Sequence, residues 1–310
     1  MKTPKPQRFT VGYHMNSWDF AGLPMRPALE FLAETGFSWF EILSKLSVHD
    51  QFSRRFVDLG DRPHATVTTD TDLFRRYATL SQAQRDLPIR LSSLYVSLEY
   101  INSKAWPVEI EVVETLLRVL KGFDAPIFVL GGGKPDRPGR EHTDQDYRDF
   151  ARSLEEIGRR SNDLGIKTVY HPHLDNFIER RDQLDRFMDV VDMDLVGLCI
   201  DPAHLAQTHS DPVDATRTYM SAIRYMHFKD THVTPGKTRG DRYKDFCELG
   251  QGVVDLPALA DVLLEAEYDG IAIIELDMGE KPPEQSALES VAYLREVMKL
   301  DLKPAASATP

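Results

Sequence analysis

The stretch Val196-Gly-Leu-Cys-Ile-Asp-Pro-Ala-His204 holds the pattern that decides the fold. A short apolar run ends at Ile200, and the polar residues Asp201 and His204 follow it directly. Short apolar runs without polar alternation are typical of strands that are buried on both faces of a parallel sheet. An Asp after such a run often caps the next helix. The stretch therefore predicts a buried strand, a polar strand end and the start of a helix.

The same pattern recurs along the chain, in alternation with longer stretches of helical period. The predicted strands are Phe9–Tyr13, Trp39–Leu43, Leu94–Leu98, Ile127–Leu130, Lys167–Tyr170, Val196–Ile200, Tyr225–Phe228 and Ile271–Glu275. Alternation of this kind predicts βα units and a parallel sheet. Eight units close most simply into a (β/α)8 TIM barrel, an α/β fold. An open doubly wound sheet is the competing fold.

The predicted helices have recognisable ends. Gly36 suits a helix C-terminus, Leu164-Gly165 ends another helix, and Asp255 with Pro257 suits a helix start. The expected helices are Pro27–Thr35, Asp146–Asp163, Leu256–Glu267 and Ala287–Leu300. Between His49 and Arg90 no strand is evident, so we expect an insertion after the second strand, with a helix over Thr71–Ala83.

No stretch rich in Gly, Ser or Pro divides the chain, so we expect a single domain. The expected division is an N-terminal tail over 1–8, the barrel over 9–302 and a disordered tail over 303–310. Two cysteines, Cys199 and Cys247, are too few for a disulfide framework and fit a reducing compartment. No apolar run is long enough to span a membrane. We therefore expect a cytoplasmic protein without a membrane partner.

The charge balance narrows the function. The 310 residues include 37 Lys and Arg against 49 Asp and Glu, a formal net charge of -12. A protein that grips phosphate backbones needs a basic face, so we expect no nucleic-acid partner. The balance does not exclude small oxygen-rich substrates, because an acidic cluster can hold a divalent metal that binds them.

Polar residues gather at the ends of the predicted strands, where barrel active sites are built. Six of the ten histidines lie at or just past a strand end: His14, His171, His173, His204, His227 and His232. Carboxylates occupy similar positions at Glu41, Glu99, Asp201 and Glu275. Imidazole nitrogens with carboxylates form a ligand set suited to Mn, Zn, Fe or Co. The pattern predicts a metal site at this end of the barrel.

Each of these residues also has an ordinary structural interpretation. His171 and His173 could be a polar pair in the core, Asp201 a helix cap, and Glu41 a salt-bridge residue. Gly131–Gly133 lacks the spacing of a phosphate-binding loop and suits tight backbone beside a pocket. Trp18 and the aromatic residues near the third strand could form an apolar wall for a sugar or simply pack in the barrel. Recurrence at successive strand ends favours the metal site.

At these positions the chain resembles the xylose-isomerase-like TIM-barrel superfamily of sugar isomerases, epimerases and related lyases. The resemblance rests on Ile-Asp-Pro-Ala-His-Leu around Asp201, Met-His-Phe-Lys-Asp around His227, Glu248-Leu-Gly-Gln-Gly-Val-Val-Asp255, and Ile-Glu-Leu-Asp around Glu275. It is clearest over residues 127–275.

The resemblance implies site residues. The ketose 3-epimerase branch holds its metal with Glu, Asp, His and Glu, and Asp201, His227 and Glu275 match the last three. The first position falls on His173, or on the neighbouring His171, rather than on a glutamate. Glu179 and His204 match substrate-contacting residues. From their position just after the first strand, rather than from the resemblance, we also expect His14 and Trp18 to bind the substrate. The His-Pro-His element followed by Glu179 looks more like the inosose-dehydratase branch.

The resemblance implies a divalent-metal-dependent sugar isomerase or epimerase, with manganese expected first and Zn, Co, Fe or Mg as alternatives. Its substrate would be a polyhydroxylated carbonyl compound, a sugar or cyclitol. Proton abstraction next to the carbonyl would give a metal-stabilised enediolate, with Glu275 and His171 or His173 as the acid/base groups. An inosose-dehydratase-like or C-glycoside-cleaving lyase shares that intermediate and is the alternative. A DNA-repair endonuclease and a non-catalytic subunit remain further alternatives. We expect a homo-oligomer, or an assembly with a second subunit.

Overall fold

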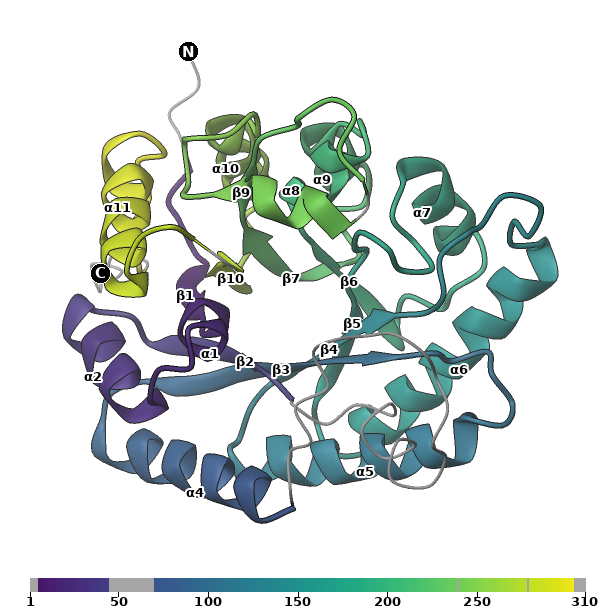
Figure 1. Cartoon of the computed structure of the whole chain (residues 1–310), viewed down its shortest axis with the longest axis horizontal. Coiled ribbons are helices and arrows are strands. Elements are labelled where there is room, and N and C mark those ends of the chain that lie inside the picture. Colours follow the sequence, from purple (N-terminus) through teal and green to yellow (C-terminus); the bar gives the residue numbers. More distant parts are fainter. Residues whose placement is uncertain (1–4, 45–69, 239, 278, 304–310) are drawn as a thin grey trace.

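The computed structural model describes residues 5–44, 70–238, 240–277 and 279–303. Eight parallel strands close into a barrel, and the order around it is β1-β10-β7-β6-β5-β4-β3-β2 (Figure 1). The barrel strands are β1 (Thr10–His14), β2 (Trp39–Leu43), β3 (Arg90–Leu98), β4 (Ile127–Gly132), β5 (Lys167–Tyr170), β6 (Val196–Ile200), β7 (Ile223–Phe228) and β10 (Ile271–Ile274). The predicted TIM barrel is thus confirmed.

Helices surround the barrel and cover the outer face of the sheet (Figure 1). They are α1 (Asn16–Phe20), α2 (Met25–Thr35), α4 (Asp70–Asp86), α5 (Trp106–Gly122), α6 (Asp144–Asn162), α7 (Arg181–Met188), α8 (Pro202–Gln207), α9 (Pro212–Thr218), α10 (Leu256–Glu265) and α11 (Pro283–Glu296). The caps follow the sequence signals: Gly36 ends α2 in a left-handed conformation at φ 106°, and the Asp255 side chain accepts from the Ala258 N–H.

The helix expected after the second strand is α4, which is longer than predicted and begins at Asp70. The rest of the predicted insertion, residues 49–69, lies outside the described residues. The same is true of residues 1–4 and 304–310 of the two expected tails. Residues 5–8 contact the barrel, because Arg8 pairs with Glu267 and the Gln7 amide donates to the Asp301 carbonyl at 2.8 Å.

Two details of the sheet differ from the prediction. β3 begins four residues early, at Arg90, because Ser92 and Ser93 point into the barrel and both hydroxyls lie 2.7 Å from the Tyr225 hydroxyl. Satisfied hydroxyls cost little when buried, so a polar sequence can continue a strand here. The β7–α10 connection also forms a small antiparallel pair, β8 (Asp230–Thr231) with β9 (Phe246–Cys247), and the 3₁₀ helix η1 (Gly240–Asp245).

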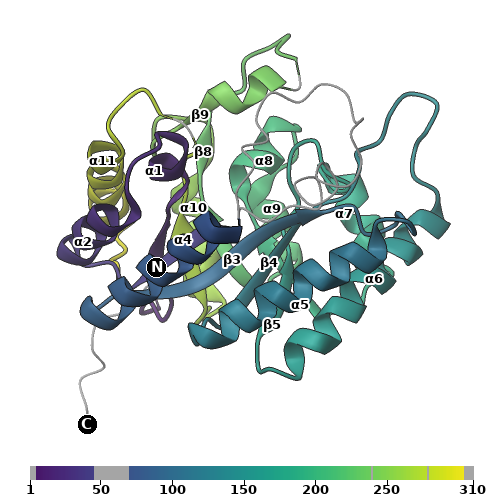
Figure 2. The same ribbon diagram turned by 60° about the horizontal axis from the view of Figure 1, so that its bottom comes forward.

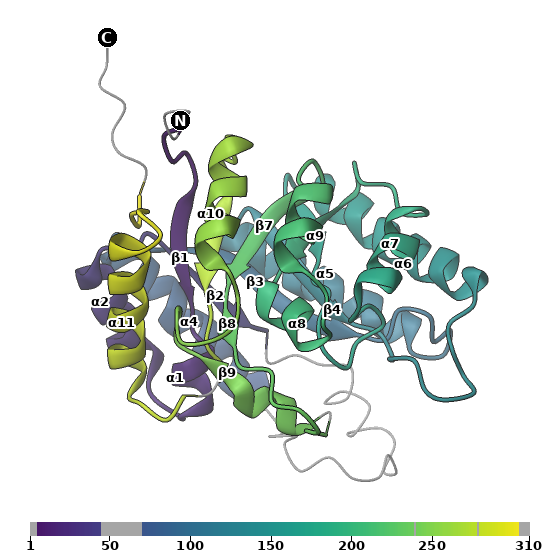
Figure 3. The same cartoon turned by 90° about the horizontal axis from the view of Figure 1, so that it is seen from above.

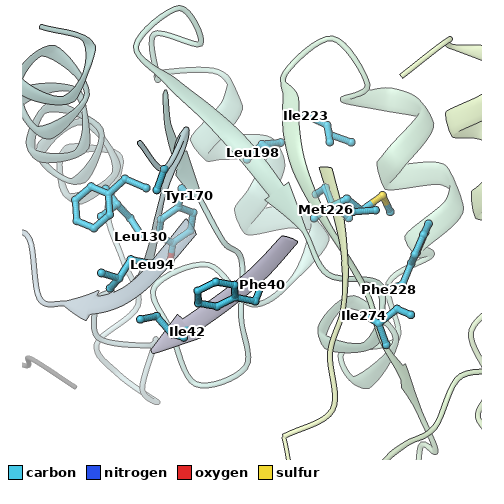
Figure 4. Packing of buried hydrophobic residues seen from close by; sticks show 14 of the residues in the cluster. Phe40, Ile42, Leu94, Leu130, Tyr170, Leu198, Ile223, Met226, Phe228 and Ile274 are labelled. Carbon is cyan, nitrogen blue, oxygen red and sulfur yellow. The ribbon is translucent and has the colours of Figure 1, made fainter. Parts of the chain in front are cut away.

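The core has an outer and an inner part. The outer part lies between strands and helices, and Figure 4 shows Phe40, Ile42, Leu130, Tyr170 and Met226 among its buried side chains. The inner part fills the barrel with Ile127, Val129, Val169, Cys199, Tyr225 and Ile273. Because this layer closes the interior, any ligand must bind above it, at the C-terminal ends of the strands.

The excursion that contains β8, β9 and η1 rises at that same end of the barrel (Figure 2). In Figure 3 it lies opposite the start of β1, together with α1 and α8. None of the described helices is both long enough and apolar enough to cross a bilayer.

Candidate metal centre

Four side chains from consecutive positions around the barrel converge above the inner core. His171 follows β5, Asp201 follows β6, His227 lies within β7 and Glu275 follows β10. One ligating atom of each residue lies within 4.8 Å of the corresponding atoms of the other three, and all four residues are buried. We call these residues the four-residue cluster.

The cluster brings imidazole nitrogens and carboxylate oxygens close together. His227 Nδ1 lies 2.6 Å from Glu275 Oε2 and 3.1 Å from His171 Nε2. Asp201 Oδ2 lies 3.7 Å from both of these histidine nitrogens. Asp201 Oδ2 and Glu275 Oε2 are buried without a hydrogen-bond partner. A buried carboxylate oxygen is costly unless a donor or cation meets it, so the donor set fits a divalent metal.

The opposite polar atom of each ligand is tied to the scaffold. His171 Nδ1–H donates to the Pro172 carbonyl at 2.9 Å, which leaves Nε2 facing the centre. His227 Nε2–H donates to Glu41 Oε2 at 3.0 Å, which leaves Nδ1 facing the centre. Asp201 Oδ1 accepts from the Ala203 N–H and caps α8. Such outer contacts fix the tautomer and orientation of metal ligands.

The pKa shifts favour the metal-binding protonation state of three of the four cluster residues, His171, Asp201 and Glu275. Burial, together with repulsion from His227, lowers the pKa of His171 to about 4 and keeps its ring neutral. Burial raises the pKa of Asp201 and of Glu275, but the Lys229 ammonium and His227 outweigh burial and lower both. Burial lowers the pKa of His227, yet the surrounding Cys199, Glu275 and Glu41 raise it well above the ordinary value. His227 is therefore the ligand that must give up a proton.

A second grouping replaces the carboxylates with the Cys199 thiol, beside His171 and His227. Burial raises the pKa of Cys199 to about 12, so the thiol stays protonated at neutral pH. Because only the thiolate is a good ligand, the oxygen ligands of Asp201 and Glu275 are favoured over sulfur.

Lys229 faces the same carboxylates. Its buried ammonium lies 2.7 Å from Asp277 Oδ2, 3.2 Å from Glu275 Oε1 and 3.8 Å from Asp201 Oδ2. Burial lowers the pKa of Lys229, but the carboxylates of Asp277, Glu275 and Asp201 outweigh burial and raise it. The Asn16 amide donates to both Glu275 Oε1 and Asp277 Oδ1, at 3.0 and 2.8 Å.

His173 and His204 lie beside the cluster. Their rings are 3.6 Å apart, and the His171 ring lies 5.3 Å from His173 and 5.5 Å from His204. His173 Nδ1–H donates to the Leu174 carbonyl at 2.7 Å. Burial, then repulsion from His171, lowers the pKa of His173 to about 4, and burial lowers that of His204 further. Within the described part of the chain, the ligand grouping contains His171 and omits His173.

Of the other predicted site residues, His14 lies near the cluster and Trp18 does not point into it. His14 approaches the site, because its Nε2 lies 3.8 Å from Glu41 Oε1. Trp18 packs instead between barrel and helices: its ring contacts Tyr13 at 5.4 Å and its N–H donates to Glu284. We therefore leave Trp18 out of the proposed pocket.

Glu179 lies in the β5–α7 connection. Its Oε2 accepts from the Asp175 N–H at 3.0 Å and lies 3.9 Å from Arg242 Nη2, on the cover formed by η1. Glu179 therefore contacts the β5–α7 connection and η1, and it is not one of the four cluster residues.

Several residues at the site were not among the predicted site residues, namely Asn16, Lys229, Asp277, Tyr95, Tyr243 and Phe246, although the strand-end pattern already included Lys229 and the aromatic residues near the third strand. Tyr95 on β3 contacts the His171 ring edge-on at 5.8 Å, and Tyr243 lies 5.8 Å from His173. Phe246 lies under the Lys229 ammonium at 4.2 Å. Lys229 and Asp277 stand in the quoted motifs, two residues after His227 and Glu275, and this spacing was the available signal.

A closed eight-stranded barrel with a buried His–Asp–His–Glu cluster at its strand ends defines a TIM-barrel protein with a metal-binding mouth. The chain belongs to the xylose isomerase-like TIM barrel family, whose model matches residues 29–297.

Relatives share parts of the chain. An inosose dehydratase of Lacticaseibacillus casei is 28% identical over 179 residues, which are 53% of this chain and 58% of the relative. The match therefore spans little more than half the length of that relative. The crystal structure of the probable 3-DHS dehydratase AsbF from Bacillus anthracis has a TM-score of 0.71, at 14% identity, and covers 93% of this chain and 100% of its own. The IolI protein with a bound zinc atom has a TM-score of 0.69, at 16% identity over 94% of this chain and 98% of its own.

Proposed function

We propose that the protein is a divalent-metal-dependent lyase that removes water from a polyhydroxylated ketone of the sugar or cyclitol class. The observation that carries the proposal is the composition of the four-residue cluster, in which an imidazole, His171, stands beside one Asp, one His and one Glu. The inosose dehydratase relative and the IolI protein with its zinc atom support a lyase with a metal site.

The ligands would be His171 Nε2, Asp201 Oδ2, His227 Nδ1 and Glu275 Oε2. A bound divalent ion would act as a Lewis acid on neighbouring oxygens of the substrate and make the adjacent C–H more acidic. Manganese remains the first candidate, and zinc gains support from the IolI protein. The mixed N/O donor set suits both ions.

The chain itself offers a base next to the ligands. Because His173 Nδ1–H is held by the Leu174 carbonyl, its Nε2 carries the lone pair, and the lowered pKa keeps that ring neutral. His173 Nε2 takes the proton from the carbon next to the carbonyl and passes it to the hydroxyl of the following carbon, whose C–O bond breaks as a C=C bond forms between the two carbons. The proton and the hydroxide together make one water, so no other reactant is needed. Tyr95, Tyr243 and Phe246 help to exclude bulk water.

An isomerase or epimerase, which the sequence favoured, is the second candidate. Epimerisation needs an acid/base group on each side of one carbon. Glu275 and His173 could supply such a pair, although the first ligand is His171 where the epimerase pattern has a glutamate. C-glycoside cleavage would use the same proton abstraction with a different leaving group.

A product assay separates these reactions. The Mn²⁺- or Zn²⁺-loaded protein is incubated with inososes, ketoses and aldoses in D₂O. Loss of one water from an inosose, seen by mass spectrometry, is the expected result. Uptake of deuterium without loss of water would establish isomerisation or epimerisation instead. If no substrate reacts and chelation leaves the melting temperature unchanged, the proposed function is wrong.

A further inference from the structure

Glu275 is held differently at its two oxygens. Oε2 faces the cluster, 2.6 Å from His227 Nδ1, and no scaffold group outside the cluster donates to it. Oε1 faces away and accepts from the Asn16 amide at 3.0 Å, while the Lys229 ammonium lies 3.2 Å from it. One oxygen is therefore available to a ligand, and the other is occupied by the protein.

Asp277 joins the two groups that hold Oε1. Its Oδ1 accepts from the Asn16 amide at 2.8 Å and its Oδ2 pairs with Lys229 at 2.7 Å. Asp277 thus holds the Lys229 ammonium beside Oε1 of Glu275, the oxygen that faces away from the cluster. The three side chains come from α1, from the residue after β7 and from the loop after β10, so their arrangement depends on the closed barrel.

We propose that Asn16, Asp277 and Lys229 form a clamp that fixes Glu275 as a one-oxygen metal ligand. This inference rests on the proposed metal site and assigns these residues a positioning role. Without the clamp, Glu275 is free to rotate or to offer both oxygens, and Lys229 is free to compete with the metal for its carboxylate. Outer contacts of this kind typically contribute 10- to 100-fold to metal affinity.

Asp277→Asn is the main test, because it keeps the shape of the side chain and removes the charge that holds Lys229 beside Oε1 of Glu275. Asn16→Ala removes the second contact to Oε1. Lys229→Met is avoided, since it would leave buried carboxylates without their cation and threaten folding.

Asp245→Asn is the matched control. Asp245 is also a buried aspartate paired with a lysine, Lys237, and it accepts from the Thr234 N–H at 3.0 Å. Its side chain contacts Thr234 and Lys237, between β8 and β9, and it does not belong to the four-residue cluster.

The experiment measures Mn²⁺ and Co²⁺ dissociation constants and the visible absorption of bound Co²⁺, which responds to ligand geometry. Circular dichroism of the metal-free variants establishes that they are folded. We expect about tenfold or greater weakening and an altered Co²⁺ spectrum for Asp277→Asn and Asn16→Ala, with Asp245→Asn unchanged. Wild-type affinity and spectrum in both clamp variants would overturn the clamp alone. If the wild-type protein binds neither ion, the clamp and the proposed metal-dependent function both fail.

Discussion

At the residue scale, each histidine of the cluster has one ring nitrogen that faces the cluster and one that is bound to the scaffold. The partner of His171 is the Pro172 carbonyl, whereas that of His227 is the Glu41 carboxylate, which is fully buried. A carboxylate raises the basicity of an imidazole more than a carbonyl does. Glu41 should therefore act on the metal through His227 without being a ligand.

Replacing Glu41 with Gln tests this role. The Gln oxygen can still accept from His227 Nε2–H, so the ring orientation is kept while the charge is lost. We expect metal affinity to fall about tenfold, measured by titration calorimetry with Mn²⁺. The control is Glu109→Gln, because Glu109 is equally buried but accepts from the N–H groups of Glu99 and Tyr100, far along the chain from the ligands. Equal affinities of Glu41→Gln and wild type would contradict the role.

At the element scale, the strands and most helix ends could be predicted because apolar runs and caps are local signals. Which of His171 and His173 belongs to the candidate ligand set could not be predicted from the sequence. Residues two apart share a face only inside a strand, and β5 ends at Tyr170, before both histidines. The conformation around Pro172 therefore decides which ring reaches the centre. Trp18 was equally undecided, because an aromatic residue after a strand can turn toward the pocket or toward the helices.

A helix contact controls where α1 places Asn16. Arg76 on α4 forms two hydrogen bonds with Asp19 on α1, at 2.6 and 2.7 Å, and both side chains are largely buried. Arg76→Met leaves Asp19 without this cation, and we expect a loss on the order of 3 kcal/mol in the free energy of unfolding by urea. Metal affinity should also fall, because α1 carries a clamp residue.

Arg26→Met is the comparison for that variant. Arg26 also reaches α4, through Asp86 at 2.7 Å, but the pair is exposed and lies on α2 rather than α1. We expect little change in stability and none in metal affinity. If both variants behave alike, the Arg76–Asp19 contact has no special role in holding α1.

At the scale of the whole molecule, the acidic charge and the histidine-rich mouth belong together. Acidic residues outnumber basic ones to give a net charge of -12, and the cluster gathers buried carboxylates around the ammonium of Lys229. A divalent ion would add to the Lys229 ammonium in offsetting this local negative charge. The buried neutral imidazoles of His171 and His173 should lower the stability of the fold at acidic pH.

The metal-free protein should therefore lose stability as the pH falls from about 6.5 toward 4. Unfolded histidines titrate near 6.5, whereas burial lowers the pKa of His171 and of His173 to about 4 in the fold. Between these values the unfolded chain binds protons that the folded chain does not, so acid favours unfolding. His227, whose pKa is raised, acts in the opposite sense, and its contribution is lost only as the pH rises through its folded pKa.

Urea unfolding at pH 7, 6 and 5 measures the slope of the free energy of unfolding against pH. His173→Gln should reduce it by about one proton, while His209→Asn, at an exposed left-handed position with φ 59°, should leave it unchanged. An unaltered slope in His173→Gln would show that this ring is not held neutral in the fold.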